Sequence, residues 1–181
     1  MGYTVSAENL IQKLGEVWIK QGLASEVGFI CVGSDRSTGD SFGPLVGTLL
    51  TEAGYKYVTG TLERPCDSSS MLERLKEVPV EVPVLAIDSC VGVSVGCFQV
   101  SDQPLAPGKS LGKPLPHVGR ASLLAVVCRN TDNPYKALQT ASLHLVMTMA
   151  KQTAAAIMKA FPLEENPARD EDHLVSHSLQ D

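Results

Sequence analysis

Short runs of almost entirely apolar residues are the feature that most restricts the fold of this chain. Such runs occupy residues 27–32, 84–87 and 121–128. A strand that is apolar on both faces has to be buried on both faces, which is typical of parallel strands covered by helices on either side. Helical stripes separate these runs, so strands and helices alternate along the chain. This order predicts a three-layer α/β/α sandwich around a mainly parallel, mixed sheet.

The other elements follow from hydrophobic periodicity and from breaker residues. Helices are expected at residues 6–22, 41–53, 68–76 and 134–161, and further strands at 57–62 and 93–100. Residues 101–119 are rich in proline, glycine and serine and are expected to form a long loop. We therefore expect residues 1–161 to fold as a single domain, and the polar, acidic residues 162–181 to form a disordered tail.

Composition and charge argue against several classes of function. The 181 residues carry a net charge of −5, whereas a general nucleic-acid-binding protein presents a basic face. No apolar run reaches the roughly 20 residues needed to cross a bilayer, and the start of the chain lacks the pattern of a secretory signal. The five cysteines show no CxxC spacing, so we expect reduced, buried thiols in a cytoplasmic protein.

The glycine-rich segment CVGSDRSTGDSFGP, residues 31–44, joins an apolar run to a helical stripe, which is a common position for a phosphate-binding loop. A Walker A loop has four residues between its two glycines, followed by a lysine. Here five residues separate the glycines, and Asp40 stands in place of the lysine. An anion would meet Asp35 and Asp40 with only Arg36 to offset their charge. The segment therefore favours a loop that presents carboxylates.

Two aspartates lie at the ends of predicted strands that are far apart in the sequence. Asp40 lies in the loop after the first apolar run, and Asp88 ends the run LAID. Ligands of open α/β sheets bind beyond the carboxyl ends of the strands, so the two residues can meet at one rim. A close pair of carboxyl groups keeps one proton, which lets one group act as an acid and the other as a base. Such a pair can activate water and protonate the leaving nitrogen of a peptide bond.

Simpler roles stay open for each candidate. Asp40 can cap the following helix, Asp88 can anchor a loop through hydrogen bonds, and Asp35 can form a turn. Two carboxylates can also hold a metal ion with a histidine as third ligand, for which His117 in the long loop is the candidate.

Three segments carry a resemblance to a known family: FICVGSDRSTGDSFGPLVG, LAIDSCVG and LAPGKSLGKPLPHVG. Together they resemble the YyaC-like sporulation proteins of spore-forming bacteria, over residues 28–160. That family is similar to the germination protease, which degrades small acid-soluble spore proteins, and more remotely to the hydrogenase maturation endopeptidases. The resemblance implies a three-layer α/β/α fold of the phosphorylase/hydrolase-like kind.

The resemblance also implies roles for individual residues. Asp40 in GDSFGP and Asp88 in AIDSC match two aspartates that are implicated in catalysis by the germination protease. In the maturation enzymes, acidic residues at these places bind nickel together with a histidine. Binding of nickel or zinc by Asp40, Asp88 and His117 is therefore the metal-dependent alternative. The segment QVSDQPLAPGKSLGK resembles one that follows the catalytic strand of the germination protease, which implies that the long loop forms a wall of the substrate site.

We therefore expect an endopeptidase with a paired-aspartate site and no cofactor. Asp40 and Asp88 are the expected catalytic residues, and Asp35, Arg36 and Ser41 are the expected substrate contacts. The expected partner is a protein substrate, with small acid-soluble spore proteins as one candidate, in the cytoplasm of a mother cell or forespore. Nucleic acid and membrane are not expected partners, and a homo-oligomer stays open. A non-catalytic regulatory or binding protein on the same fold is the alternative from another class.

Overall fold

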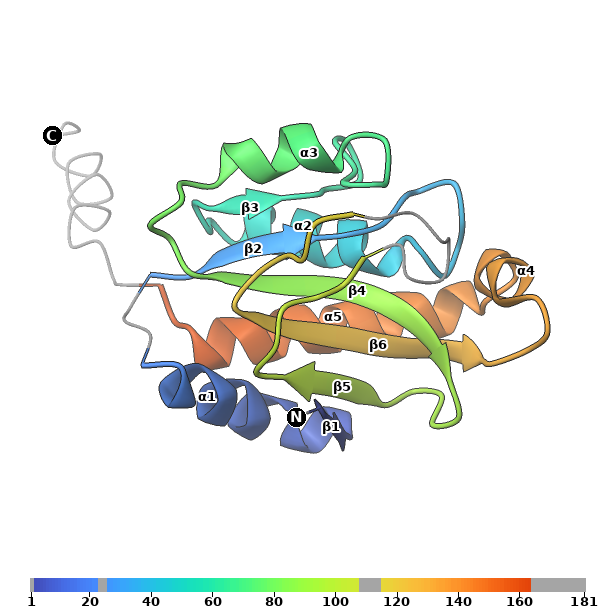
Figure 1. Ribbon diagram of the computed structural model, residues 1–181. Helices are drawn as coiled ribbons and strands as arrows, with labels where there is room; N and C mark the ends of the chain where they lie inside the picture. Colours follow the sequence, from blue (N-terminus) through green and yellow to red (C-terminus); the bar gives the residue numbers. More distant parts are fainter. Residues whose placement is uncertain (1, 23–25, 108–114, 164–181) are drawn as a thin grey trace, which may run out of the picture.

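The computed structural model describes residues 2–22, 26–107 and 115–163. Its centre is a sheet of six strands in the order β1-β5-β6-β4-β2-β3 (Figure 1). The strands are β1 (Gly2–Val5), β2 (Gly28–Cys31), β3 (Val58–Thr59), β4 (Val84–Gly92), β5 (Phe98–Ser101) and β6 (Ala121–Arg129). Strands β3, β2, β4 and β6 run parallel, whereas β5 is antiparallel to β6 and β1 is antiparallel to β5. The predicted mixed, mainly parallel sheet is confirmed.

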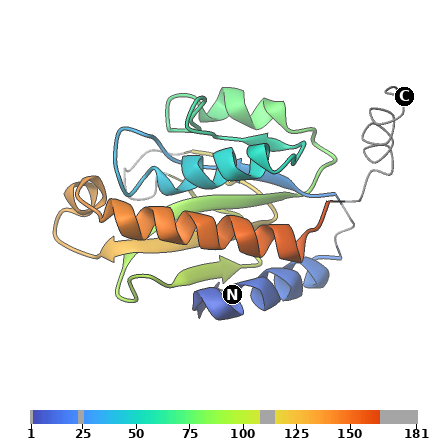
Figure 2. The same ribbon diagram turned by 180° about the vertical axis from the view of Figure 1, so that it is seen from behind.

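Helices cover both faces of the sheet, as the alternation of strands and helices predicts. They are α1 (Leu10–Lys20), α2 (Phe42–Glu52), α3 (Met71–Arg74), α4 (Pro134–Gln139) and α5 (Leu143–Ala160), with 3-10 turns at Ala7–Asn9 and Leu75–Glu77. Helices α1, α2 and α5 pack on one face, which Figure 2 shows in front of the sheet. Helix α3 packs on the opposite face, beside the chain around Leu105 and Val118.

The strands are buried on both faces because a core lies on each side of the sheet. The larger core lies under α1, α2 and α5 and contains three fully buried rings, those of Phe29, Phe42 and Phe98. The smaller core lies under α3. In β4, Ile87 faces the larger core and its neighbour Ala86 faces the smaller one. This burial on both sides explains why the strand is an unbroken apolar run in the sequence.

The strand that carries Asp88 is longer than the sequence predicts. The expected strand at 84–87 continues as β4 to Gly92, so Asp88 lies inside the strand and not at its end. The neighbouring β2 stops at Cys31, which pairs with Ile87. Asp88 is therefore the first residue of β4 beyond the end of β2, and this places it at the rim despite its position within a strand.

Three further predictions about elements were incomplete. The helix expected at 134–161 is two helices, because the chain breaks at 140–142 and Ser142 begins α5 by accepting a hydrogen bond from the amide of Leu145 at 3.3 Å. The strands expected at 57–62 and 93–100 are only Val58–Thr59 and Phe98–Ser101. Strand β1 was not predicted, because it is an exposed edge strand that pairing with β5 defines.

Parts of two expected segments lie outside the described residues. These are 108–114 of the long loop and 164–181 of the expected disordered tail. The two described ends of the loop meet, because Leu105 and Val118 exchange backbone hydrogen bonds of 2.8 Å. All five cysteines are free; Cys31 and Cys66 are buried and the other three are partly buried. None of the described helices has the length and apolar character that a membrane span requires.

Candidate active site

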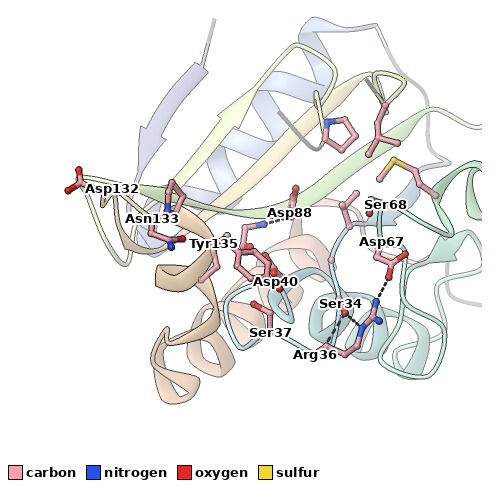
Figure 3. Close-up of a pocket in the computed structure, with 18 residues that line it drawn as sticks. Ser34, Arg36, Ser37, Asp40, Asp67, Ser68, Asp88, Asp132, Asn133 and Tyr135 are labelled. Carbon is pink, nitrogen blue, oxygen red and sulfur yellow. Dashed lines mark hydrogen bonds and ion pairs between the residues drawn. The ribbon is translucent and has the colours of Figure 1, made fainter. Parts of the chain in front are cut away.

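A pocket with a volume of about 640 Å³ opens at the rim where the parallel strands end (Figure 3). Each of the four parallel strands leads to part of its wall. After β2 the wall contains Gly33, Ser34, Arg36, Ser37 and Asp40, and after β3 it contains Asp67 and Ser68. In β4 it contains Asp88 and Ser89, and after β6 it contains Asp132, Asn133, Pro134, Tyr135 and Leu138. Pro107 and Leu115 of the long loop also line the pocket, in keeping with the wall that the family resemblance implies.

The loop after β2 holds Asp40 at the pocket by a sharp turn. Gly33 has a φ of 142°, and a Cβ atom at this position would lie 2.0 Å from the carbonyl oxygen of Asp40. Only glycine fits this conformation and this contact. The loop is closed by a hydrogen bond of 3.1 Å from the amide of Ser34 to the same carbonyl oxygen. It is also tied to α4, because the amide of Gly39 donates to the carbonyl oxygen of Leu138 at 2.8 Å.

Asp40 does not take the capping role that its position before a helix suggested. Helix α2 begins at Phe42, and Ser41 occupies the N-cap position. In the described part of the chain, no hydrogen bond joins the Asp40 carboxylate to an amide of that helix. The carboxylate is instead part of the pocket wall (Figure 3).

Asp88 lies in the same pocket, where burial favours its protonated form. Burial raises its pKa to about 8, the amide of Ser89 lowers the pKa in part, and the charge of Asp40 raises it further. The amide of Ser89 donates to Oδ1 of Asp88 at 2.7 Å. Burial also raises the pKa of Asp40, and the hydroxyl group of Ser37 opposes this shift. Burial of Asp88 and the charge of Asp40 thus both favour the protonated form of Asp88.

Arg36 is fixed at the wall by Asp67, a residue that the sequence did not single out. Its guanidinium group donates to Oδ2 of Asp67 at 2.7 Å and to the hydroxyl oxygen of Ser34 at 3.2 Å. Burial would raise the pKa of Asp67, but hydrogen bonds from Ser69 and Ser70 outweigh it and lower the pKa to about 2. Arg36 thus faces the pocket as one half of an ion pair (Figure 3).

The other expected contact residues do not line the pocket. Asp35 is exposed on the surface of the loop. Ser41 is buried, and its hydroxyl group donates to the carbonyl oxygen of Thr38 at 2.7 Å. Of the five residues named from the sequence as catalytic or substrate contacts, the structure brings Asp40, Asp88 and Arg36 together.

The expected metal set does not come together in the described residues. His117 is exposed and is not part of the pocket wall. Within residues 2–22, 26–107 and 115–163, no three histidine, cysteine, aspartate or glutamate side chains are grouped so as to hold a metal ion. Among the described residues, Asp40 and Asp88 therefore have no histidine or further acidic side chain placed as a third ligand.

Several wall residues were missed, although a simple signal marks them. Asp67, Asp132, Asn133 and Tyr135 all lie in segments that follow parallel strands. Ligand sites of α/β sheets collect residues from just these segments. Applying that rule to every predicted strand, and not only to those with an obvious acidic ending, would have found them.

Comparisons with known proteins agree with the sequence resemblance. The family model described as "Protein of unknown function (DUF1256)" matches residues 3–156. The "Uncharacterized protein YyaC" of Bacillus subtilis (strain 168) is 35% identical over 159 residues, which cover 84% of this chain and 78% of that protein. The expected likeness to YyaC-like proteins is thus confirmed.

A solved structure shows the same fold. The NiFe hydrogenase maturation protease HycI from Thermococcus kodakarensis KOD1 matches with a TM-score of 0.54 and covers 82% of this chain and 97% of that protein. The sequence identity is 17%, so this likeness concerns the fold. It agrees with the α/β/α architecture that the sequence predicts.

Proposed function

We propose a peptidase activity for this chain, which belongs to the DUF1256 family and is YyaC-like over most of its length. One observation carries the proposal: Asp88 and Asp40 line one open pocket, in which burial and the charge of Asp40 raise the pKa of Asp88 to about 8. The fold shared with a maturation protease is consistent with the proposal. An acid and a base at one site are the two groups that hydrolysis of an amide requires.

The proposed reaction divides two proton transfers between the two aspartates. Asp40 takes a proton from a water molecule while the water oxygen bonds to the carbonyl carbon of the substrate. Asp88 gives its proton to the amide nitrogen as the carbon–nitrogen bond breaks. The products are a carboxylic acid and an amine, and the proton on Asp40 returns to Asp88 through water. The assignment follows from the raised pKa of Asp88, which suits it to give a proton.

The proposed substrate is a protein. Small acid-soluble spore proteins are the first candidates, through the resemblance to the germination protease. This choice places the activity in the cytoplasm of a sporulating cell. We propose no cofactor, because the pair can carry out both proton transfers by itself.

The test is a cleavage assay on a chymotryptic peptide pool from bacterial cytosol and on a purified small acid-soluble spore protein. New termini are identified by mass spectrometry. We expect cleavage by the wild-type protein and a loss of at least about 100-fold in Asp40→Asn and Asp88→Asn, the scale of general acid–base catalysis. Asp35→Asn removes an exposed carboxylate from the same loop and should cleave at the wild-type rate. Absence of wild-type cleavage, or undiminished cleavage by either pocket variant, would refute the proposal.

A further inference from the structure

One edge of β4 has no strand partner among the described residues beyond the point where β2 ends. Strand β2 pairs with β4 only as far as Ile87, whereas on the other side β6 stays paired as far as Gly92. The last hydrogen bond on the β2 side runs from the amide of Val32 to the carbonyl oxygen of Ile87, at 2.7 Å. The chain then turns away, because the amide of Gly33 donates to the carbonyl oxygen of Cys66 at 2.9 Å.

The direction of the free backbone groups follows from the alternation of a strand. The carbonyl oxygen of Ile87 points toward β2, whereas that of Gly92 accepts from the amide of Asn130 on the β6 side, at 3.3 Å. Odd-numbered residues of β4 therefore turn their backbone groups to the β2 side. The backbone groups of Ser89 and Val91 thus point to the side on which β2 has already ended.

Most of these groups are unused. The amide of Ser89 is taken by Asp88. In the part of the chain that the structure describes, neither the carbonyl oxygen of Ser89 nor the amide of Val91 has a partner on that side. The hydroxyl group of Ser89 is also buried and lacks a partner among the described residues. Buried polar groups are rarely left without partners, so this edge is suited to receive one.

The pocket reaches the near end of this edge, at Asp88 and Ser89. Asp88 and Ser89 are neighbours with side chains on opposite faces of β4, and both line the pocket, so the pocket reaches around the edge itself. At the far end the wall includes Asp132 and Asn133, which follow β6 just past its pairing with Gly92. The free stretch 88–92 spans about 16 Å at the usual rise of a strand.

We propose that the open edge of β4 binds the main chain of an extended polypeptide as an added strand in line with β2. This inference deepens the proposed function, on which it rests for the fate of the bound segment. The carbonyl oxygen of Ser89 and the amide of Val91 supply the hydrogen bonds, and Asp88 lies beside the bound backbone. Recognition through main-chain hydrogen bonds accepts many sequences but requires an extended, unfolded segment.

The first test compares two substitutions of Val91. Val91→Pro removes the free N–H group without removing a hydrogen bond to β6, whereas Val91→Ala keeps the N–H group and shortens only the side chain. On the chymotryptic peptide pool, we expect Val91→Pro to cleave about tenfold more slowly than wild type across peptides of different sequence. Val91→Ala keeps the N–H group, so we expect it to cleave about tenfold faster than Val91→Pro. Wild-type cleavage by a Val91→Pro protein with a native melting temperature would overturn the inference.

A second measurement does not depend on the folding of the proline variant or on cleavage. Amide hydrogen exchange is followed by NMR in Asp40→Asn, with and without an excess of the same peptide pool. We expect about tenfold slower exchange at Val91 and no change at Val93, an 87% exposed residue in the following turn. Unchanged exchange at Val91 refutes the added strand even if the wild type cleaves peptides. Slower exchange without any cleavage refutes the peptidase but supports the edge as a polypeptide-binding site.

Discussion

Replacing Asp88 by asparagine is expected to stabilise the protein at neutral pH, although it removes a proposed catalytic group. Burial raises the pKa of Asp88 from its ordinary value of 3.8 to about 8. Between these two values the folded protein holds a proton that the unfolded chain has released. The free energy of unfolding therefore falls as the pH rises through this window, and the full stability is present only below about pH 4. Asparagine removes this dependence and can still accept the hydrogen bond from the amide of Ser89.

The size of the effect follows from the width of the window. Each pH unit in which the proton counts differ changes the free energy of unfolding by about 1.4 kcal/mol. From pH 4 to pH 7 this gives an upper limit of about 4 kcal/mol. The side chain is partly open to the pocket, where water reduces the penalty, so we expect Asp88→Asn to gain about 2 to 4 kcal/mol at pH 7. At pH 4 the two proteins should be equally stable.

Urea unfolding at pH 4, 5, 6, 7 and 8 measures this difference. Trp18 is the only tryptophan and is 6% exposed, so its fluorescence reports unfolding of the main core. Asp35→Asn, which changes an exposed aspartate in the loop after β2, controls for the general effect of replacing an aspartate by asparagine. If the difference between Asp88→Asn and wild type stays the same from pH 4 to pH 8, Asp88 has no raised pKa. The assignment of Asp88 as the acid of the pair would then be wrong.

Three further substitutions or reactions probe other parts of the structure. Gly33→Ala places a Cβ atom 2.0 Å from the carbonyl oxygen of Asp40. We expect the free energy of unfolding, measured in urea, to fall by about 2 to 4 kcal/mol, and peptide cleavage to be lost. A variant with native stability would contradict the tight turn. Tyr55→Phe removes a hydrogen bond of 2.7 Å to the carbonyl oxygen of Phe161 and should lower the melting temperature by about 2 to 4 °C. An unchanged melting temperature would mean that water replaces this hydrogen bond. Burial raises the pKa of Cys90 to about 11. Iodoacetamide at pH 7.5, followed by mass spectrometry, should therefore label Cys90 at least about tenfold more slowly in the folded protein than in urea. Equal labelling rates would show an accessible thiolate.

The layers of the fold were predictable because local patterns and burial agree. The apolar runs around Phe29 and Ile87 can be buried on both faces only between two helix layers, and the structure buries them there. The exposed strand β1 could not be predicted in the same way. Residues Gly2–Val5 have no buried face, and only the backbone bonds to β5 make them a strand. Edge strands of this kind are defined by partners far away in the sequence.

The candidate site was predicted in part, since the sequence indicates which residues follow a strand but not how far neighbouring strands extend. Asp40 and Asp88 were expected at one rim, and both line the pocket. Their meeting depends on β4 extending past β2, a difference in length that appears only once the register is known. Ser41 was expected to contact the substrate because it stands next to Asp40. Its hydroxyl group instead turns back to the loop and not to the pocket.

The break between α4 and α5 was also hidden from local patterns. No glycine or proline interrupts residues 135–160, so one continuous helix was the natural prediction. The first helix ends where the carbonyl oxygen of Leu138 accepts from the amide of Gly39, a contact between distant segments. Tertiary contact of this kind overrides helix propensity.

The bond between Gly39 and Leu138 ties the first quarter of the chain to its last third, and this has a consequence for biosynthesis. A wall assembled from segments between residues 32 and 138 cannot form while a ribosome is still making the later strands. Contacts of such long range form late in folding. A nascent or partly folded copy therefore presents two ordinary, separately hydrated aspartates. The proposed hydrolytic activity would therefore require the chain to be complete at least as far as Leu138.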